Sequence, residues 1–265
     1  MSRMPVLFLG HGSPMNAIED NAWRRGWARV AAEIPRPRAI LMVSAHWETQ
    51  GIALTSGDAP ETIHDFFGFP QPLSDVRYAA PGAPWLAERA RDLIAGSNVP
   101  VSRIVMDAQR GFDHGAWSVL LPMYPAADIP LVQLSLDRSL APAQHLELAR
   151  ALAPLRDEGV LVIGSGDIVH NLRVDFRRAG VQPWALTFNE TAKALIVSDD
   201  AVALANYEAL GPEALASINS VEHYLPLLYV VGLRGAGDVV RFFNDDVFAA
   251  ISMTSVIIGE ERQAA

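Results

Sequence analysis

The stretch LFLGHGSP (residues 7–14) sets a short apolar run directly against a histidine between two glycines. An apolar run of this length without polar alternation is typical of a strand that is covered on both faces of its sheet. The stretch ILMVSAHW (residues 40–47) repeats the arrangement, because a second apolar run leads into a histidine. The two stretches together indicate a buried sheet with histidines near the ends of its strands.

Similar apolar runs recur along the chain and alternate with segments of helical periodicity, some of which end in helix-stop signals such as Gly159. This alternation predicts an α/β sandwich with a mostly parallel sheet. A stretch rich in Pro, Gly, Asp and Thr (48–84) is expected to be a long loop excursion. The expected strands are 5–10, 38–45, 101–106, 129–136, 160–166 and 254–259, the expected helices are 85–95, 141–159 and 183–197, and residues 261–265 are expected to fray.

Composition excludes several classes of function. The chain has 265 residues, half of them hydrophobic, and a formal net charge of -9, so nucleic-acid or anionic-membrane binding through a basic face is not expected. Cysteine is absent, which excludes disulfides, thiolate metal sites and a cysteine nucleophile. The first apolar run is too short for a signal-peptide core, and the most apolar later segment (224–233) is too short to span a membrane. We therefore expect a cytoplasmic protein.

Five histidines occupy positions that favour a common site. His11, His46 and His170 each follow or end an expected strand, and ligands in open α/β sheets gather at the carboxyl ends of the strands. His114 lies in a glycine-bounded loop before an expected helix, and His223 lies at the start of an apolar helix. Imidazole is a common ligand of zinc, iron and copper. Without cysteine, a histidine-rich metal site with open coordination positions is the natural interpretation.

The two remaining histidines carry weaker signals. His145 lies inside the expected helix 141–159, and we expect it on the solvated side. His64 stands beside Asp65 in a loop, where it either stabilises a turn or belongs to the site.

Other chemistries fail their sequence tests. The segment Gly10–Pro14 lacks the third glycine of a dinucleotide-binding loop, and neither this segment nor GSGD (164–167) has the lysine of a phosphate loop. Neither segment fits the Gly-x-Ser-x-Gly pattern of a serine hydrolase. A metal-dependent activity is therefore the favoured interpretation. A zinc-dependent hydrolase, in which the metal activates water, is one alternative for such an activity.

The five candidate histidines lie in the segments GHGSPMN (10–16), SAHW (44–47), GFDHGAW (111–117), HNLR (170–173) and EHYLPLLYV (222–230). Taken together they resemble the bacterial 4,5-DOPA extradiol dioxygenase family. That family belongs to the class III extradiol ring-cleaving dioxygenases, as does the catalytic subunit of protocatechuate 4,5-dioxygenase. The likeness continues through residues 62–70, 123–135 and 155–166, so that it covers essentially the whole chain.

The resemblance implies one three-layer α/β/α domain over residues 1–265, with a non-haem metal at the carboxyl edge of the sheet. His11, His46 and His223 match the metal ligands of the family. His170 matches the acid/base histidine, which is sometimes close enough to count as a fourth ligand. His114 matches a histidine thought to hydrogen-bond the substrate or oxygen.

The sequence offers two candidates, Glu222 and His223, for the third metal ligand. The wider class uses a glutamate there, and Glu222 directly precedes His223. We favour His223, since the DOPA-type branch places its ligand at that position. Three neutral imidazoles leave a divalent site at a charge of +2, whereas a glutamate would reduce the charge to +1. The more positive site should retain zinc readily. We thus expect Fe(II) for activity and Zn(II) in aerobically purified protein.

The expected reaction is the opening of a catechol ring with O₂, by 4,5-cleavage of L-DOPA or a related catechol to a seco product of the muconic semialdehyde type. The expected partners are therefore a small catechol and O₂, and the chain could be a monomer or a homodimer. A non-catalytic metal-binding protein is a third interpretation, but it would have no use for His114 and His170. Loop position makes His64 and Asp65 candidates for substrate binding, together with Phe66, Phe67 and Phe69.

Overall fold

A computed structural model describes residues 3–175 and 179–260, which leaves the expectation for residues 261–265 outside the described part of the chain. The strands are β1 (Val6–Gly10), β2 (Ala39–Thr49), β3 (Ile52–Thr55), β4 (Ile104–Asp107), β5 (Leu131–Asp137), β6 (Val160–Gly166), β7 (Val239–Phe243), β8 (Val247–Phe248), β9 (Ile251–Ser252) and β10 (Ser255–Gly259). The α-helices are α1 (Ala22–Glu33), α2 (Gln71–Ser74), α3 (Pro84–Ala95), α4 (His114–Met123), α5 (Pro142–Ala151), α6 (Pro154–Asp157), α7 (Pro183–Val197), α8 (Ala201–Ala205), α9 (Pro212–Ser217) and α10 (Leu225–Gly232), and the 3-10 helices are Pro14–Ala17 and Tyr207–Leu210.

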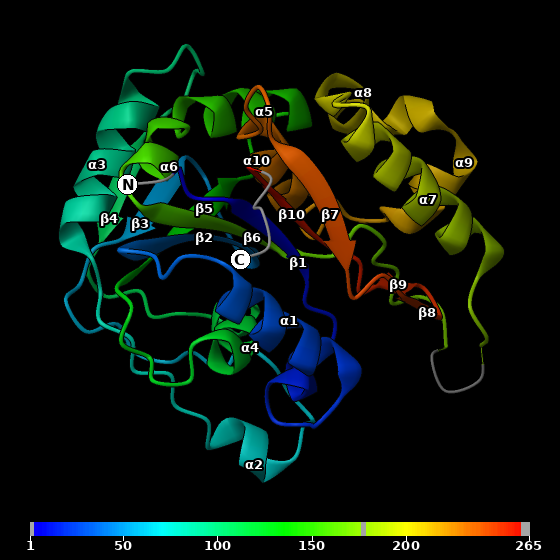
Figure 1. Cartoon of the computed structure of the whole chain (residues 1–265), viewed down its shortest axis with the longest axis horizontal. Coiled ribbons are helices and arrows are strands. Elements are labelled where there is room, and N and C mark those ends of the chain that lie inside the picture. Colours follow the sequence, from blue (N-terminus) through cyan, green and yellow to red (C-terminus); the bar gives the residue numbers. More distant parts are fainter. Residues whose placement is uncertain (1–2, 176–178, 261–265) are drawn as a thin grey trace.

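The central sheet has the strand order β4-β3-β5-β2-β6-β1-β10-β7 in the described residues (Figure 1). Its middle strands β5, β2, β6 and β1 are parallel to their neighbours within this set. The strand β10 joins β1 in antiparallel pairing, β7 continues antiparallel at that edge, and β3 pairs with β5 in the antiparallel sense. The carboxyl ends of β1, β2 and β6 consequently lie together in the middle of one sheet edge.

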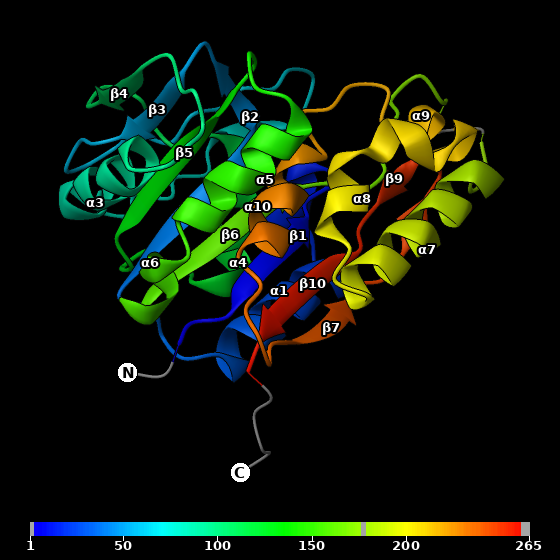
Figure 2. The ribbon, with the colours of Figure 1, turned by 90° about the horizontal axis from the view of Figure 1, so that it is seen from above.

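Helices cover both faces of the sheet. Figures 1 and 2 show α1 and α4 on one face, with α3, α5 and α10 on the other. Successive residues of a strand point to opposite faces, and β1 illustrates this, since Phe8 packs with one core cluster and Leu7 with the other. The protein is thus a single-domain α/β fold of three layers with a mostly parallel sheet, as the sequence predicts.

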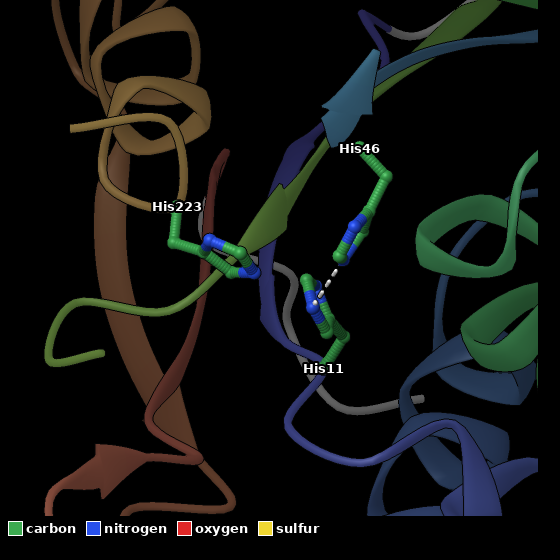
Figure 3. A group of neighbouring side chains, drawn as sticks. All are labelled: His11, His46 and His223. Carbon is green, nitrogen blue, oxygen red and sulfur yellow. Dashed lines mark hydrogen bonds between the residues drawn. The ribbon is translucent and has the colours of Figure 1, made fainter. Parts of the chain in front are cut away.

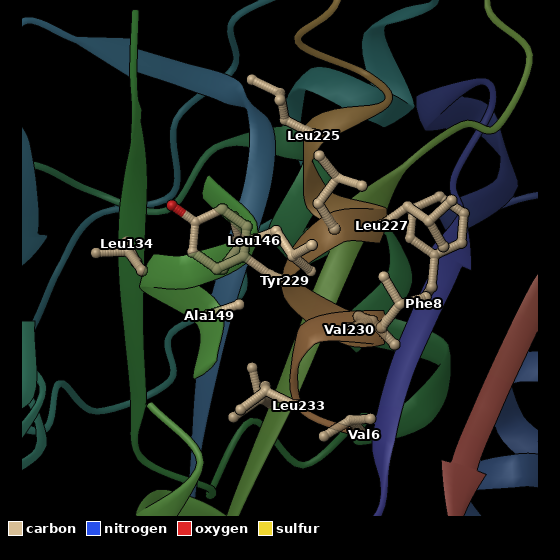
Figure 4. Close-up of a cluster of buried hydrophobic side chains, with 14 of the residues drawn as sticks. Val6, Phe8, Leu134, Leu146, Ala149, Leu225, Leu227, Tyr229, Val230 and Leu233 are labelled. Carbon is tan, nitrogen blue, oxygen red and sulfur yellow. The ribbon is translucent and has the colours of Figure 1, made fainter. Parts of the chain in front are cut away.

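The helix α10 forms the centre of the larger core. Its residues Leu225–Val231 are buried and apolar on every side, as expected of a helix that is surrounded by protein. Figure 4 shows its side chains between β1 and α5, where Val230 lies beside Phe8 and Tyr229 lies beside Leu146. Because His223 lies just before α10, this packing fixes the position of His223 relative to the sheet.

Several elements differ from the sequence expectation. The stretch 48–84 is not a continuous loop, because it contains β3 and the single turn of α2. The expected helix 141–159 is two helices, α5 and α6, since Pro154 cannot donate a backbone hydrogen bond and starts a new helix. The strand β2 runs to Thr49, so His46 lies within the strand and does not end it. The positive φ of 80° at Gly159 fits the expected helix-stop position.

No helix among the described residues is long and apolar enough to cross a lipid bilayer.

Candidate functional site

Three histidines from distant parts of the chain converge at the carboxyl edge of the sheet. His11 follows β1, His46 belongs to β2, and His223 precedes α10, and Figure 3 shows their rings pointing toward one another. One ring nitrogen of each lies within 4.8 Å of the others. The Nε2 atoms of His11 and His46 are 3.2 Å apart. Two imidazole nitrogens this close repel each other through their lone pairs unless a proton or a metal ion lies between them.

The other ring nitrogen of His11 is held by a serine. The hydroxyl of Ser165 donates to the carbonyl of Gly115 (2.6 Å), so its oxygen accepts from Nδ1–H of His11 (3.1 Å). This arrangement leaves Nε2 of His11 without a proton and directs it at the cluster. A hydrogen bond to the non-ligating nitrogen is the usual way in which a protein orients a metal-binding histidine.

His223 is oriented in the same manner by a carboxylate. Its Nδ1–H donates to Oε1 of Glu222 at 2.9 Å, and Ser220 donates to the same oxygen. Gly166 brings β6 against this segment, since a Cβ atom at residue 166 would lie only 2.1 Å from the carbonyl oxygen of His223. The structure therefore places His223 among the converging nitrogens, while Glu222 binds the far side of its ring.

His46 lies where β2 is irregular. The register between β2 and β5 shifts between Val43 and Glu48, and such a bulge re-aims the side chains within it. The ring of His46 packs against that of His114, with ring centroids 3.8 Å apart. The site thus depends on a local departure from regular strand geometry.

His114 begins α4, and two aspartates anchor it. Asp113 is the N-cap of α4, and Oδ1 of Asp65 accepts hydrogen bonds from both the backbone N–H (3.0 Å) and Nδ1–H (2.9 Å) of His114. Burial opposes the ionisation of Asp65, yet its hydrogen bond and charge interaction with His114 outweigh burial and lower the pKa of Asp65 to about 2. Asp65 is therefore a carboxylate at neutral pH.

His170 lies flat against His223. The ring centroids are 3.5 Å apart and the planes differ by 7°. The backbone N–H of His170 donates to the carbonyl of Ser217 at 3.0 Å, which fixes the residue to the segment before His223. The structure therefore brings His170 to the cluster as a stacked neighbour of one converging histidine.

Asp167 is a buried carboxylate at the same edge, and the sequence reasoning missed it. It directly follows β6, and its Oδ2 lies 3.7 Å from Nε2 of His11. The segment GSGD lacks the lysine of a phosphate loop and does not fit the serine-hydrolase pattern, but the strand-end rule that selects His11 also selects the residue after β6.

Burial controls protonation throughout the cluster. Burial lowers the pKa of His11 and of His223 well below the usual value, and neighbouring imidazoles lower both further. Burial and the proximity of His114 lower the pKa of His46 to about 3, and burial lowers that of His170 to about 4. Burial raises the pKa of Asp167 well above its usual value. Neutral imidazole is the form that binds metal ions, so His11, His46, His170 and His223 are in the binding form at neutral pH.

The sequence-selected loop residues have other contacts. His64 donates from Nε2 to the carbonyl of Val76 at 3.0 Å and packs against Trp117. Asp65 holds His114, as described above. Substrate binding by His64 and Asp65 stays a prediction.

The expectation for His145 is wrong. This histidine is fully buried, and its Nε2–H donates to the carbonyl of Asp137 while Nδ1 accepts from the hydroxyl of Tyr229. The helix α5 packs against α10 on this side, so the position that we expected to face solvent faces the core.

A cavity of about 420 Å³ opens beside the histidines. Charged side chains of both signs line it, and Arg138 follows directly on the carboxyl end of β5. The lining residues are Ala45, His46, Glu48, Arg138, Glu222 and His223. A small molecule in this cavity would touch two of the converging histidines.

The donor set fits a metal ion. Three neutral imidazole nitrogens, two of them oriented from behind by hydrogen bonds, are typical of an open metal site that leaves positions for substrate. The fold and this site define a class: an α/β protein with a histidine-based metal centre at the carboxyl edge of its sheet.

Comparison with known proteins narrows this class to a family. Residues 5–245 match the family described as the catalytic LigB subunit of aromatic ring-opening dioxygenase. The chain is 47% identical over 266 residues to a 4,5-DOPA dioxygenase extradiol of Escherichia coli (97% of this chain, 96% of the relative). It is 40% identical to a protein of the same name from Beta vulgaris (91% and 90%). The crystal structure of an uncharacterized Escherichia coli K12 protein matches with a TM-score of 0.82 and 41% identity, over 97% of this chain and all of the other.

The chain belongs to the LigB family of ring-opening dioxygenases, and it is an extradiol ring-cleaving dioxygenase. The family is non-haem and metal-dependent, in agreement with the histidine cluster. Membership therefore favours the dioxygenase over the zinc-dependent hydrolase that the sequence reasoning left open.

Proposed function

We propose that residues 1–265 form one catalytic domain that binds Fe(II) through His11, His46 and His223 and cleaves L-DOPA or a closely related catechol. The ring bond that breaks joins carbon 4, which bears a hydroxyl group, to carbon 5, which does not. Both atoms of O₂ enter one seco product of the muconic semialdehyde type. The observation that carries this proposal is the convergence of the three ring nitrogens within 4.8 Å in a chain of this family.

Fe(II), when bound, supplies the redox partner without which the reaction of a catechol with O₂ is spin-forbidden, and it holds both reactants together. The protein side chains supply orientation and proton transfer. Ser165 and Glu222 hold His11 and His223 from behind, so that both rings keep their metal-facing nitrogens free of protons.

His170 is proposed as the acid/base group. It is stacked on His223 beside the cluster, and its neutral ring can accept the proton of a catechol hydroxyl and later return it. Its place next to a proposed ligand also fits the expectation that His170 is a fourth ligand of the metal.

His114 is proposed to stabilise negative charge that develops on the reacting oxygens. Asp65 binds Nδ1–H of His114, which fixes the ring and leaves Nε2 for a contact in the site. Asp65 thus acts on the substrate indirectly, by fixing the ring of His114. His64 stabilises the loop that carries Asp65 through its hydrogen bond to the carbonyl of Val76.

The charged cavity supports an amino-acid catechol as the substrate. Arg138 offers a guanidinium to a carboxylate, while Glu48 and Glu222 offer carboxylates to an ammonium group. The names of the relatives from Escherichia coli and Beta vulgaris point to the same molecule, DOPA.

The test uses protein stripped of metal and reloaded without oxygen with either Fe(II) or Zn(II). Oxygen uptake and product absorbance are then followed with L-DOPA, with dopamine, which lacks the carboxylate, and with 3,4-dihydroxyphenylpropionate, which lacks the ammonium group. We expect one O₂ consumed per catechol by the Fe(II) form, a yellow product, preference for L-DOPA and no turnover by the Zn(II) form. Equal activity of the Zn(II) form contradicts the proposed metal, and indifference to the side-chain charges contradicts the proposed substrate.

A further inference from the structure

Asp113 is a charged side chain in a fully buried position, between the sheet and the first turn of α4. Its neighbours Ser44 and Gln133 are fully buried as well. A buried carboxylate is costly unless hydrogen bonds replace its water. The N-cap role of Asp113 accounts for one such bond, from the backbone N–H of Ala116 to Oδ1 at 3.3 Å. The remaining contacts of Asp113 point to a second role.

Gln133 of β5 binds Asp113 at two points. The Nε2–H of Gln133 donates to Oδ2 of Asp113 at 2.7 Å, and Oε1 of Gln133 accepts from the backbone N–H of Asp113 at 2.9 Å. Only this orientation of the amide sets a donor against each acceptor. Because His114 directly follows Asp113, the two bonds fix the start of α4, and with it His114, to the middle of the sheet.

Ser44 of β2 carries the connection to His46. Its hydroxyl donates to Oδ1 of Asp113 at 2.7 Å, and its oxygen accepts from the backbone N–H of His46 at 3.2 Å. His46 lies inside the register shift between β2 and β5, where the regular pairing of these two strands is interrupted. The bulge that directs the His46 ring is therefore connected to Asp113 through one hydroxyl group.

The first turn of α4 lies very close to β2 at this point. A Cβ atom at Gly115 would lie 2.3 Å from Oγ of Ser44 and 2.9 Å from Cδ2 of His46. The close approach lets the rings of His46 and His114 pack with centroids 3.8 Å apart. Asp113 precedes one of these histidines in the chain and reaches the other through Ser44, so a single carboxylate connects both.

We propose that Asp113 is a positioning residue for the reaction, which fixes His46 and His114 relative to each other. The proposal rests on the proposed function, because it takes His46 as a metal ligand and His114 as the group that stabilises charge on the reacting oxygens. Asp113 acts through these two rings and not by direct contact with metal or substrate. A displacement of about 1 Å in such a group can cost about 100-fold in rate.

The test exchanges the acid and the amide between two positions. Asp113→Asn sets an amide N–H against donors of its neighbours, although asparagine caps a helix as well as aspartate does. Gln133→Glu sets a second carboxylate against Asp113. In the combined variant, the new amide donates to the new carboxylate, whose second oxygen accepts from the backbone N–H of residue 113. The amide oxygen still accepts from Ser44, so every hydrogen bond of the network is restored.

The wild type and the three variants are loaded with Co(II), whose visible spectrum reports the atoms around the ion, and circular dichroism verifies the fold. We expect each single variant to change the Co(II) spectrum and to lower kcat of the Fe(II) form with L-DOPA by about 10–100-fold. The combined variant should return the wild-type spectrum, and its kcat should lie within about threefold of wild type.

Asp238→Asn is the matched control for a general loss of stability. Asp238 is a buried aspartate that pairs with the buried Arg156, which also donates to the carbonyl of Met4 near the amino end of β1. We expect this variant to unfold at a lower urea concentration with an unchanged Co(II) spectrum. A spectral change as large as that of Asp113→Asn contradicts the inference, because destabilisation alone would then account for it.

The other outcomes also decide. Wild-type spectra in both single variants, or a combined variant no closer to wild type than they are, overturn the inference and leave the proposed function standing. A wild-type protein that binds no metal overturns both. If a single variant does not fold, Ser44→Ala replaces it, since this change removes only the hydroxyl between Asp113 and His46. We expect a changed Co(II) spectrum there too, and an unchanged one rejects the positioning role.

Discussion

The rings of His170 and His223 are stacked in parallel, with centroids 3.5 Å apart. The stacking places the proposed acid/base group against a proposed ligand without any hydrogen bond between the two. Removal of the His170 ring should therefore spare metal binding and abolish proton transfer. We expect His170→Ala to retain one metal ion per chain and to lose turnover by about 10²–10⁴-fold. Oxygen uptake with L-DOPA and elemental analysis measure the two effects, and turnover near the wild-type level contradicts the assigned role.

Variants of Glu222 and His223 can show which of the two residues binds the metal ion. Glu222→Gln keeps an acceptor for Nδ1–H of His223 but loses the charge, whereas Glu222→Ala loses both. We expect Zn(II) affinity to fall in the order wild type, Gln, Ala, with a total loss of about 10–100-fold, since Glu222 acts behind the ring. Chelator competition measures the constants. Should His223→Ala keep its metal while Glu222→Ala loses it, then Glu222 is the ligand.

Gly166 allows β6 to approach the His223 segment. A Cβ atom there would lie 2.1 Å from the carbonyl oxygen of His223, a backbone atom that cannot rotate away. We expect Gly166→Ala to destabilise the fold by about 1–3 kcal/mol and to weaken metal binding by displacing His223. Gly180→Ala is the control, because within the described part of the chain no atom beyond its chain neighbours lies within 4 Å of the added Cβ. Urea unfolding compares them, and equal stability of the two variants rejects the steric argument.

His145 should make stability depend on pH. Burial lowers its pKa to about 4, and a carbonyl and a hydroxyl hold the neutral ring. The unfolded chain, with a histidine pKa of about 6.5, binds the proton more readily, so stability falls as the pH is lowered from about 6.5 to 4. At pH 5 the loss is about 2 kcal/mol. Urea unfolding of wild type and His145→Gln should show a gap in unfolding free energy that narrows between pH 7 and pH 5. A constant gap refutes the assignment.

The strand ends were predictable from the sequence, because uninterrupted apolar runs mark strands that are covered on both faces. This rule located β1, β2 and β6 and with them His11, His46 and His170. Spacing could not reveal the partners of those histidines. In the sequence, Ser165 is an ordinary residue of a strand, and only the folded structure shows that its hydroxyl contacts His11. The same rule points to Asp167, which directly follows β6, but an interpretation that considers only histidines leaves this residue out.

Other elements escaped prediction for physical reasons. The helix α1 carries Gly26 in its middle, which weakens the helical signal, yet a Cβ there would lie 1.9 Å from Oδ1 of Asn244. The helix after His114 was expected, and it is α4, but its bounds were not predictable because it is buried on nearly all sides, shows no amphipathic pattern and contains Pro122. The strand β7 at the sheet edge is partly exposed and lacks the continuous apolar run of the central strands.

The pairing of β1 with β10 sets the order in which the centre can form during synthesis. Val6 pairs with Ile258, so the strand that leads into His11 lacks one of its two neighbours until residue 258 has left the ribosome. Contacts so distant in sequence close slowly. During almost all of translation, β1 can therefore pair only with β6 and has one unpaired side. A chain that is released before β10 is synthesised would have His11 after a strand that is paired on one side only.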